Sequence, residues 1–367
     1  MLTKKAKLPK VLANIYLNKK TPVSLIHFLT NRCNARCSFC FIDFDNPKTF
    51  AGELTLDEID KMTKNMGNTL LNVNFTGGEP FARKDILEIA KLYIKNTTIQ
   101  SIYITTNGSL PDRILSFAEE INKFDSNIEL NFQISIDDIP ERHNAVRKVK
   151  NIFEDCIKSY RLIKNLNIPN ITASASITVS HENCLNIKEI FYYLTEDCKI
   201  DSIKCCIVRD EGVYKTPKEK RDQILNAYNW LTNNIVLYKK QKKINNYNNT
   251  IQGRIHNKKD EISWELVKKI YPNNKYISPC HASSLFGVIT ADGKVYPCEI
   301  LEDKLIGNLR DHDMNFMDVW NSKKNKEIKN FILKTECRCT YECAISFNIL
   351  GNWRYQHKLL SGLLSYY

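Results

Sequence analysis

Short β-rich runs alternate with helical patterns between Leu70 and about Asp210, and no other feature of this sequence constrains its fold as strongly. Strands that alternate with helices form βα units, in which the strands lie parallel in one sheet. With one strand before the first cysteines, six strands are expected, at 23–30, 70–76, 101–107, 128–137, 171–180 and 202–209. Helices are expected from Thr55 onward and at 85–96, 111–123, 149–166 and 184–195. The sequence therefore predicts the α/β class: a partial (β/α)6 barrel of the TIM type, with a small C-terminal cysteine-rich domain.

The predicted strands carry polar residues on one face. Within 171–180, hydroxyl residues alternate with Ile, Ala and Val, so the two kinds of side chain point to opposite faces. A closed barrel fills its interior with Val, Ile and Leu. Here the inward positions are neutral hydrogen-bonding groups, among them Asn72, Asn74, Asn131, Gln133, Ser174 and Ser176. A polar lumen of this kind predicts a polar cofactor and a polar substrate.

Composition and cysteine positions divide the 367 residues into four expected segments. At roughly 150 residues per domain, the length allows about two domains. Residues 211–275 shift toward Lys, Asn and Tyr and indicate a helix followed by an exposed connector. Cysteines return after Ser278, beside a hairpin turn at Asp292-Gly293. We expect an N-terminal extension at 1–22, the barrel at 23–215, a helical connector at 216–275 and the cysteine-rich domain at 276–367.

Three cysteines form the first candidate metal site. Cys33, Cys37 and Cys40 have the spacing C-x3-C-x2-C, in the loop after the first expected strand. The chain has 13 cysteines and no secretory signal, which favours metal binding over disulfides. Clustered thiolates hold iron–sulfur centres or zinc. Structural sites have four protein ligands, whereas three leave one metal position open for a substrate or cofactor.

Two further motifs complete the pattern. Phe39 precedes the third cysteine, and the second expected strand ends in Thr76-Gly77-Gly78-Glu79-Pro80, where paired glycines allow the backbone to approach a ligand closely. Together with the cysteines, these residues resemble the radical S-adenosylmethionine (SAM) superfamily over about residues 23–215. The resemblance implies that Cys33, Cys37 and Cys40 ligate a 4Fe–4S cluster whose open iron binds SAM. It also implies reductive cleavage of SAM to a 5'-deoxyadenosyl radical, which takes a hydrogen atom from the substrate.

The same resemblance implies SAM-binding residues at the ends of the expected strands. Gly77, Gly78 and Glu79, followed by Pro80, would hold the amine of SAM. The other residues implied are Phe39 beside the cluster, Thr106 and Asn107 on the third strand, Ser135 and Asp137 at the ribose, and Arg147 and Arg209 at the carboxylate. Catalytic groups at the C-terminal ends of barrel strands are typical of this architecture.

Five cysteines lie in the C-terminal segment: Cys280, Cys298, Cys337, Cys339 and Cys343. Their pattern resembles the SPASM and twitch extensions, which add auxiliary iron–sulfur clusters to radical SAM barrels. Five cysteines, rather than the seven of a full SPASM pattern, favour one auxiliary 4Fe–4S cluster held by Cys280, Cys298 and two of the last three. A zinc ribbon is the alternative.

One further cysteine is a candidate catalytic residue. Cys206 shares a face of the sixth expected strand with Lys204, opposite Cys205, and by parity this face points into the lumen. A thiol there can return a hydrogen atom to a substrate radical, as in radical SAM epimerases. The other cysteines outside the two clusters are expected to pack in the core.

Several functions remain open. The leading hypothesis is dehydrogenation or epimerisation of a sugar or cyclitol, because the lumen is lined with neutral hydrogen-bonding groups. The alternative is modification of a ribosomal peptide, although only 32 residues precede Cys33, too few for a separate peptide-recognition domain. RNA modification would use the net charge of +12, but the basic residues are spread along the chain. A non-enzymatic metal or electron-transfer module does not explain the three-ligand site or the Gly-Gly-Glu-Pro motif.

The expected partners follow from these hypotheses. They are a small polar substrate or a peptide, and a flavodoxin- or ferredoxin-type electron donor; nucleic acid is disfavoured, and no membrane is expected. No uninterrupted apolar stretch is long enough to span a bilayer, so a cytoplasmic protein is expected.

Overall fold

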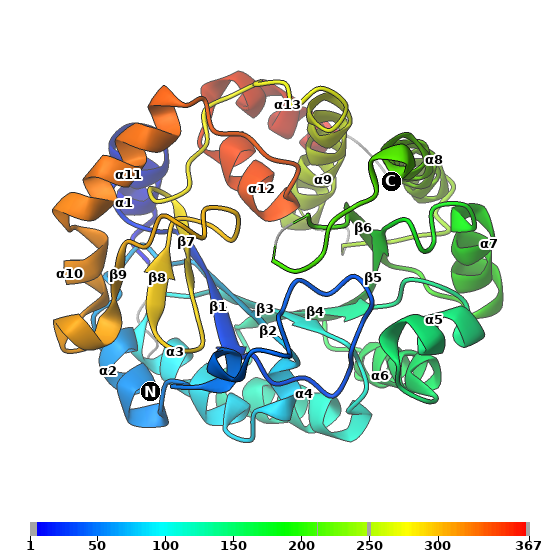
Figure 1. Ribbon diagram of the computed structural model, residues 1–367, viewed down its shortest axis with the longest axis horizontal. Helices are drawn as coiled ribbons and strands as arrows, with labels where there is room; N and C mark the ends of the chain where they lie inside the picture. The colour runs from blue at the N-terminus through cyan, green and yellow to red at the C-terminus, as the bar shows by residue number, and fades with distance from the viewer. Residues whose placement is uncertain (1–5, 211, 248–250, 365–367) are drawn as a thin grey trace.

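Nine strands form one sheet in the computed structural model, which describes residues 6–210, 212–247 and 251–364. The strand order is β6-β5-β4-β3-β2-β1-β7-β8-β9 (Figure 1). The first six strands pair in parallel, and each lies within two residues of its expected bounds. They are β1 (Ser24–Thr30), β2 (Asn72–Gly77), β3 (Ser101–Thr106), β4 (Glu129–Ser135), β5 (Ile171–Val179) and β6 (Ile203–Ile207). The predicted α/β class and partial barrel are confirmed.

Helices of the barrel follow the strands and cover the outer face of the sheet (Figure 1). They are α2 (Leu56–Lys64), α3 (Ile86–Asn96), α4 (Pro111–Phe124), α5 (Pro140–Arg147), α6 (Ile152–Asn165) and α7 (Ile187–Tyr192), with α1 (Leu8–Ala13) before the first strand. A capping box opens α2: the Thr55 hydroxyl accepts from Glu58 N, and the Glu58 carboxylate accepts from Thr55 N. Helix α5 was not expected; Pro140 opens it, and Lys148 ends it with a positive φ of 55°.

Alternation along each strand separates the core from the lumen. The outward side chains Val73, Phe75, Ile102, Ile104 and Phe132 are fully or almost fully buried against the helices. The polar residues between them point to the other side of the sheet. The main hydrophobic core therefore lies between sheet and helices, and the inner face of the strands is left for a site.

The C-terminal segment joins the same sheet. Strand β7 (Phe286–Ile289) pairs in parallel with β1, and β8 (Lys294–Tyr296) and β9 (Gly307–Asn308) continue in antiparallel order. The predicted hairpin turn lies between β7 and β8, where Gly293 has a φ of +84°. The remaining helices are α10 (Phe316–Trp320), α11 (Lys323–Lys334), α12 (Glu342–Leu350) and α13 (Gln356–Ser361).

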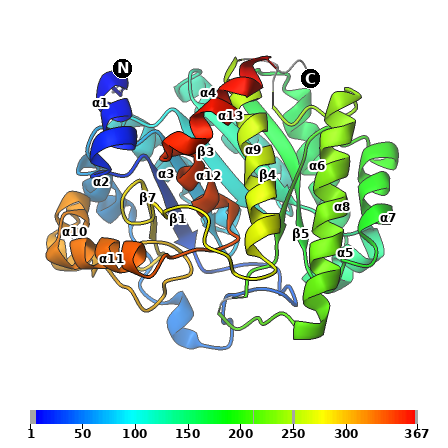
Figure 2. The same ribbon diagram turned by 90° about the horizontal axis from the view of Figure 1, so that it is seen from above.

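The region expected to be one helix and an exposed connector contains two long helices. These are α8 (Arg221–Lys240) and α9 (Ile251–Ile270), which lie side by side (Figure 1, Figure 2). The expectation of exposure was wrong for Asn246 and Tyr247, which are buried; residues 248–250 lie outside the described residues. Asn246 accepts from Ile203 N at 2.8 Å and donates to Ile203 O at 2.7 Å, so it satisfies the free edge of β6. Among the described residues, no helix is long and apolar enough to cross a membrane.

Candidate metal and cofactor site

The inward faces of β2 to β6 form a polar surface that solvent reaches. Thr105 is exposed although it lies in the middle of the sheet. Neighbouring inward residues that keep part of their accessible surface are Asn72, Asn74, Gln133, Ser135, Ser176, Thr178, Lys204 and Cys206. In the middle of β1 and on β7 the inward residues Ile26, Phe28 and Val288 are apolar instead and form one small cluster. The lumen is therefore polar over most of its wall and apolar at the β1–β7 side.

The three-cysteine loop leaves the C-terminal end of β1. Arg36 N donates to Arg147 O at 3.1 Å and Ser38 N donates to Val146 O at 3.2 Å, which fixes the loop against the end of α5. The Cys33 sulfur accepts from Ala35 N at 3.3 Å and from the side-chain amide of Asn107 at 3.7 Å. The loop is therefore held by two segments of the barrel, the end of β3 and the end of α5.

The chemistry of these thiols fits a cationic cluster. Burial raises the pKa of Cys33 to about 11, and the nearby negative groups of Glu79, Cys37 and Cys40 raise it as well. Burial also raises the pKa values of Cys37 and Cys40. Within the described residues, no group of three or more His, Cys, Asp or Glu side chains is already arranged for a metal ion. Three thiolates beside a buried carboxylate repel one another, and the irons of a cluster supply the positive charge that offsets this repulsion.

Gly77 and Gly78 bring the end of β2 against the segment that enters the cysteine loop. A Cβ on Gly77 would lie 2.0 Å from Thr30 O, and one on Gly78 would lie 2.2 Å from Arg32 O. Gly77 also has a φ of +139°, a conformation that side chains disfavour. The paired glycines thus allow the end of β2 to approach the main chain at Thr30 and Arg32, rather than a ligand. This approach sets the position of the cysteine loop relative to β2.

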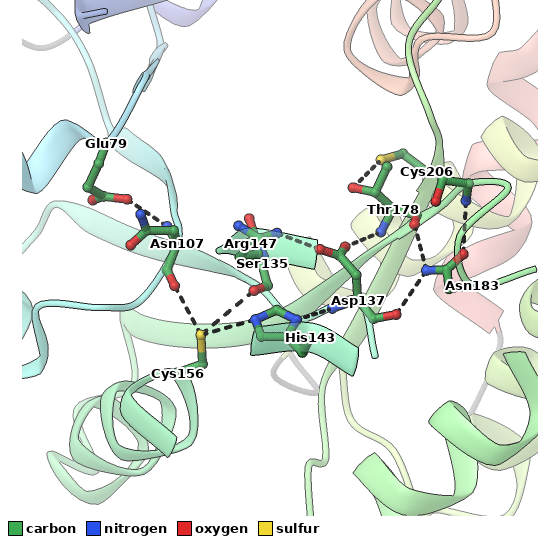
Figure 3. Close-up of polar contacts among 11 residues, drawn as sticks. Glu79, Asn107, Ser135, Asp137, His143, Arg147, Cys156, Thr178, Asn183 and Cys206 are labelled. Carbon is green, nitrogen blue, oxygen red and sulfur yellow. Dashed lines mark hydrogen bonds and ion pairs between the residues drawn. The ribbon is translucent and has the colours of Figure 1, made fainter. Parts of the chain in front are cut away.

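Glu79 connects the ends of β2 and β3. It is 1% exposed, and its carboxylate accepts from Asn107 N at 2.7 Å (Figure 3). It also accepts from the Thr106 hydroxyl at 2.7 Å and from Phe81 N at 3.0 Å. Burial raises the pKa of this carboxyl group. Pro80 follows as the first residue of a short 3-10 helix. Both oxygens of Glu79 therefore serve to position the strand ends, and contact with a SAM amine stays a prediction.

Asp137 and Arg147 form a buried ion pair with an O–N distance of 2.5 Å. The other Asp137 oxygen accepts from Thr178 N at 2.8 Å, so the pair links β4, α5 and β5 (Figure 3). Arg147 also lowers the pKa of Cys37 by its charge, although burial makes the net shift upward. The ribose-side and carboxylate-side candidates are thus brought together beside the cluster loop. Ser135 lies on the same strand end, facing the lumen.

Three residues of this network were missed by sequence reasoning. His143 accepts from Asp137 N at 3.2 Å, and Cys156, expected only to pack, donates to Asn107 O at 3.0 Å (Figure 3). Asn183 donates to Asp137 O at 2.8 Å. Burial lowers the pKa of His143 well below its ordinary value, so the imidazole is neutral. The only local signal was the i,i+4 spacing of His143 and Arg147 on one helix.

Cys206 lies on the lumen wall as its parity predicts. Its sulfur donates to the Thr178 hydroxyl at 3.8 Å, across the β5–β6 pair (Figure 3). Burial raises the pKa of this thiol to about 12. The side chain therefore keeps its S–H at neutral pH, which is the form that a hydrogen donor needs.

Arg209 faces the C-terminal segment. Its guanidinium is paired with Glu299, and its centre lies 4.7 Å from the Tyr341 ring and 5.7 Å from the Phe41 ring. Phe41 follows the first cysteine cluster, and Glu299 and Tyr341 lie among the C-terminal cysteines. Arg209 therefore connects the two cysteine regions. The prediction that it binds the carboxylate of SAM did not anticipate this position.

The five C-terminal cysteines come together from three segments. Cys280 and Cys337 share a side-chain hydrogen bond, and Cys298 lies close enough to Cys337 for the two charges to interact. Cys339 interacts in the same way with Cys280 and Cys343. Cys343 also donates to Glu299 at 3.5 Å. This all-thiol donor set fits an iron–sulfur cluster, and the spare cysteine is not distinguished by these contacts.

Comparison with known families gives two matches along the chain. Residues 28–191 match the model of the radical SAM superfamily. Residues 280–344 match that of SPASM, an iron-sulfur cluster-binding domain. The two ranges contain both cysteine clusters, the Gly-Gly-Glu-Pro motif and β7 with its hairpin.

Individual relatives cover parts of the chain. Fe-coproporphyrin III synthase of Methanosarcina barkeri is 29% identical over 198 residues, 52% of this chain and 45% of the relative. The sporulation killing factor maturation protein SkfB of Bacillus subtilis is 26% identical over 176 residues, 47% of this chain and 40% of the relative. This chain thus spans less than half the length of these curated relatives. The crystal structure of Streptococcus suis SuiB bound to S-adenosylmethionine shares the fold, with a TM-score of 0.60 and 18% identity over 88% of this chain and 71% of SuiB.

Proposed function

Because this chain belongs to the radical SAM superfamily and carries a C-terminal SPASM iron–sulfur domain, we propose that it is an enzyme that modifies a peptide. Two similarities support a peptide over a sugar or cyclitol. One curated relative is named as a maturation protein for a sporulation killing factor. SuiB, whose fold is similar, has also been solved with its precursor peptide SuiA.

The observation that carries the proposal is the position of Cys343, one of the auxiliary cysteines, beside the inner face of the sheet. Because β7 pairs with β1, Cys343 packs against the inward cluster that contains Ile26 and Phe28. A substrate in the lumen would therefore lie between the two cysteine clusters. An auxiliary cluster at this position can accept an electron from the substrate or bind one of its groups.

The residues of the lumen have distinct roles in this proposal. Cys33, Cys37 and Cys40 hold the barrel cluster, which together with SAM supplies one-electron chemistry that removes a hydrogen atom from the substrate. Amide and hydroxyl side chains such as Gln133 and Ser176 can pair with the peptide groups of an extended substrate. Cys206 keeps a proton on its sulfur and can deliver hydrogen to the substrate.

The electron donor in this proposal is a flavodoxin- or ferredoxin-type protein. Arg32 and Arg36 are exposed in the three-cysteine loop, so positive charge lies next to the first cluster site. An acidic donor protein would be attracted to this surface, and the electron would have a short path to the barrel cluster. The attraction should weaken as salt concentration rises.

Peptide modification can be tested with the reconstituted enzyme. We would incubate it with SAM, a reductant and short peptides encoded beside its gene, and measure 5'-deoxyadenosine and peptide mass. A peptide that loses two hydrogens, or takes up one deuterium from deuterated buffer, would support the proposal. If sugars or cyclitols stimulate 5'-deoxyadenosine formation and no peptide is changed, the proposal is wrong.

A further inference from the structure

Lys204 is a basic side chain on the wall of the polar lumen. The register of β5 and β6 pairs it with Ser176, just as it pairs Cys206 with Thr178, so all four side chains point inward. Lys204 is surrounded by protein and still keeps solvent-accessible surface. Its side chain is therefore partly accessible to solvent on the inner face of the sheet.

Two tyrosine side chains hold the ammonium group in place. Lys204 Nζ donates to the Tyr247 hydroxyl at 2.7 Å and lies 4.4 Å from the centre of the Tyr247 ring and 5.7 Å from that of Tyr103. Within the described chain, no carboxylate lies at ion-pair distance from Lys204; Asp260 is paired with Lys259 at 3.2 Å. An ammonium group has three N–H donors, so Lys204 retains donors for a further acceptor.

Lysine side chains gather in this part of the interior. The charges of Lys259, Lys204 and Lys239 lower the pKa of the buried Asp260 carboxyl group against the effect of burial, and Glu261 is a second carboxylate near Lys239. Lys239 is 1% exposed, and its Nζ has no hydrogen-bond partner within the described chain. Burial lowers the pKa of Lys204 to about 8. An anion bound beside Lys204 would offset this unfavourable burial.

We propose that Lys204 is an anion-binding group of the substrate cavity, and that it binds the carboxylate of an acidic residue in the peptide. This inference rests on the proposed function. The inward hydroxyls of the neighbouring strand β5, such as Ser174, Ser176 and Thr178, are neutral and bind an acid and its amide about equally well. Lys204 is the group that distinguishes them.

The experiment compares two small probes, N-acetyl-glutamate amide and N-acetyl-glutamine amide. Their binding to the full, reconstituted protein with SAM is measured by saturation-transfer NMR, which detects weak ligands. Variants Lys204→Met and Lys204→Arg are compared with Lys243→Met. Lys243 also lies over a tyrosine ring, 4.8 Å from the centre of Tyr238, but its side chain is 52% exposed, so it is the matched control.

We expect the wild type and Lys243→Met to bind the glutamate probe about tenfold to a hundredfold more tightly than the glutamine probe, the range for one hydrogen bond between charged groups. Lys204→Met should abolish the preference, and Lys204→Arg should keep part of it. The iron content of each variant shows whether it has folded, and Lys204→Arg preserves the buried charge should the methionine variant fail.

Three results would overturn the inference: no preference in the wild type, a preference that survives in Lys204→Met, or no saturation transfer to either probe. The proposed function fails separately. If the glutamate preference depends on Lys204 but no peptide is modified, the anion site stands and the peptide assignment is wrong. If peptides are modified and no preference exists, only the anion site is wrong.

Discussion

Replacing Arg147 with methionine tests the buried ion pair that links β4, α5 and β5. The Arg147 and Asp137 side chains are 6% and 5% exposed and meet at 2.5 Å. Methionine keeps part of the volume of the arginine stem and removes its charge. The Asp137 carboxylate then remains buried, and its hydrogen bond from Thr178 N does not supply a counter-charge. Removing one partner of a buried pair costs about 3–5 kcal/mol.

Thermal unfolding of the cluster-free protein without SAM measures this cost apart from any role in cofactor binding. Each kcal/mol lowers Tm by about 2–4 °C in a domain of 150–250 residues, so Arg147→Met should lower Tm by roughly 6–20 °C. The double variant Asp137→Asn with Arg147→Met removes the orphaned charge and should recover part of this loss. If the Tm of Arg147→Met lies within about 2 °C of the wild-type Tm, the Asp137–Arg147 pair does not stabilise the fold as proposed.

Three further predictions concern single residues. Gly78→Ala should lower the iron bound by the barrel loop and spare the C-terminal site, because its Cβ would lie 2.2 Å from Arg32 O; iron analysis would show no selective loss if this contact were unimportant. Cys206→Ala should abolish uptake of solvent deuterium into an epimerised peptide, and uptake that persists would exclude Cys206 as the donor. Burial lowers the pKa of His27 to about 3, against about 6.5 when unfolded, so its contribution to stability is complete above pH 6.5 and is lost as pH falls toward 3. The urea midpoint of the cluster-free protein should therefore fall between pH 6.5 and pH 5, and fall less in His27→Gln; equal slopes would contradict this.

The barrel strands could be predicted because each leaves a local signal. Alternation along β5 indicates which side chains face the helices and which face the lumen. A shift of one residue in the register of the strand would have exchanged the two faces. The same parity placed Cys206 on the lumen wall, where its sulfur meets the Thr178 hydroxyl. Local patterns suffice for these features because burial alternates with the strand period.

Pairings between distant segments left no comparable signal. Strand β7 joins β1 across more than 250 residues, and nothing in either strand specifies the partner. The partners of Glu79 and Arg209 were missed for the same reason. A charged residue in a sequence indicates that it needs a partner, but it does not indicate which residue that partner is. Helix α9 was missed because the Lys- and Asn-rich stretch 239–250 before it predicts an exposed connector, although Asn246 and Tyr247 in that stretch are buried.

The central claim is that one chain holds two iron–sulfur sites, one at each cysteine cluster. Iron and acid-labile sulfide per chain, measured after anaerobic reconstitution, test it most directly when the wild type is compared with a triple alanine variant of Cys33, Cys37 and Cys40. Two occupied sites should give about eight irons in the wild type and about four in the variant, one 4Fe–4S cluster being lost. About four irons falling to none would contradict it, because the C-terminal cysteines would then hold no iron–sulfur cluster.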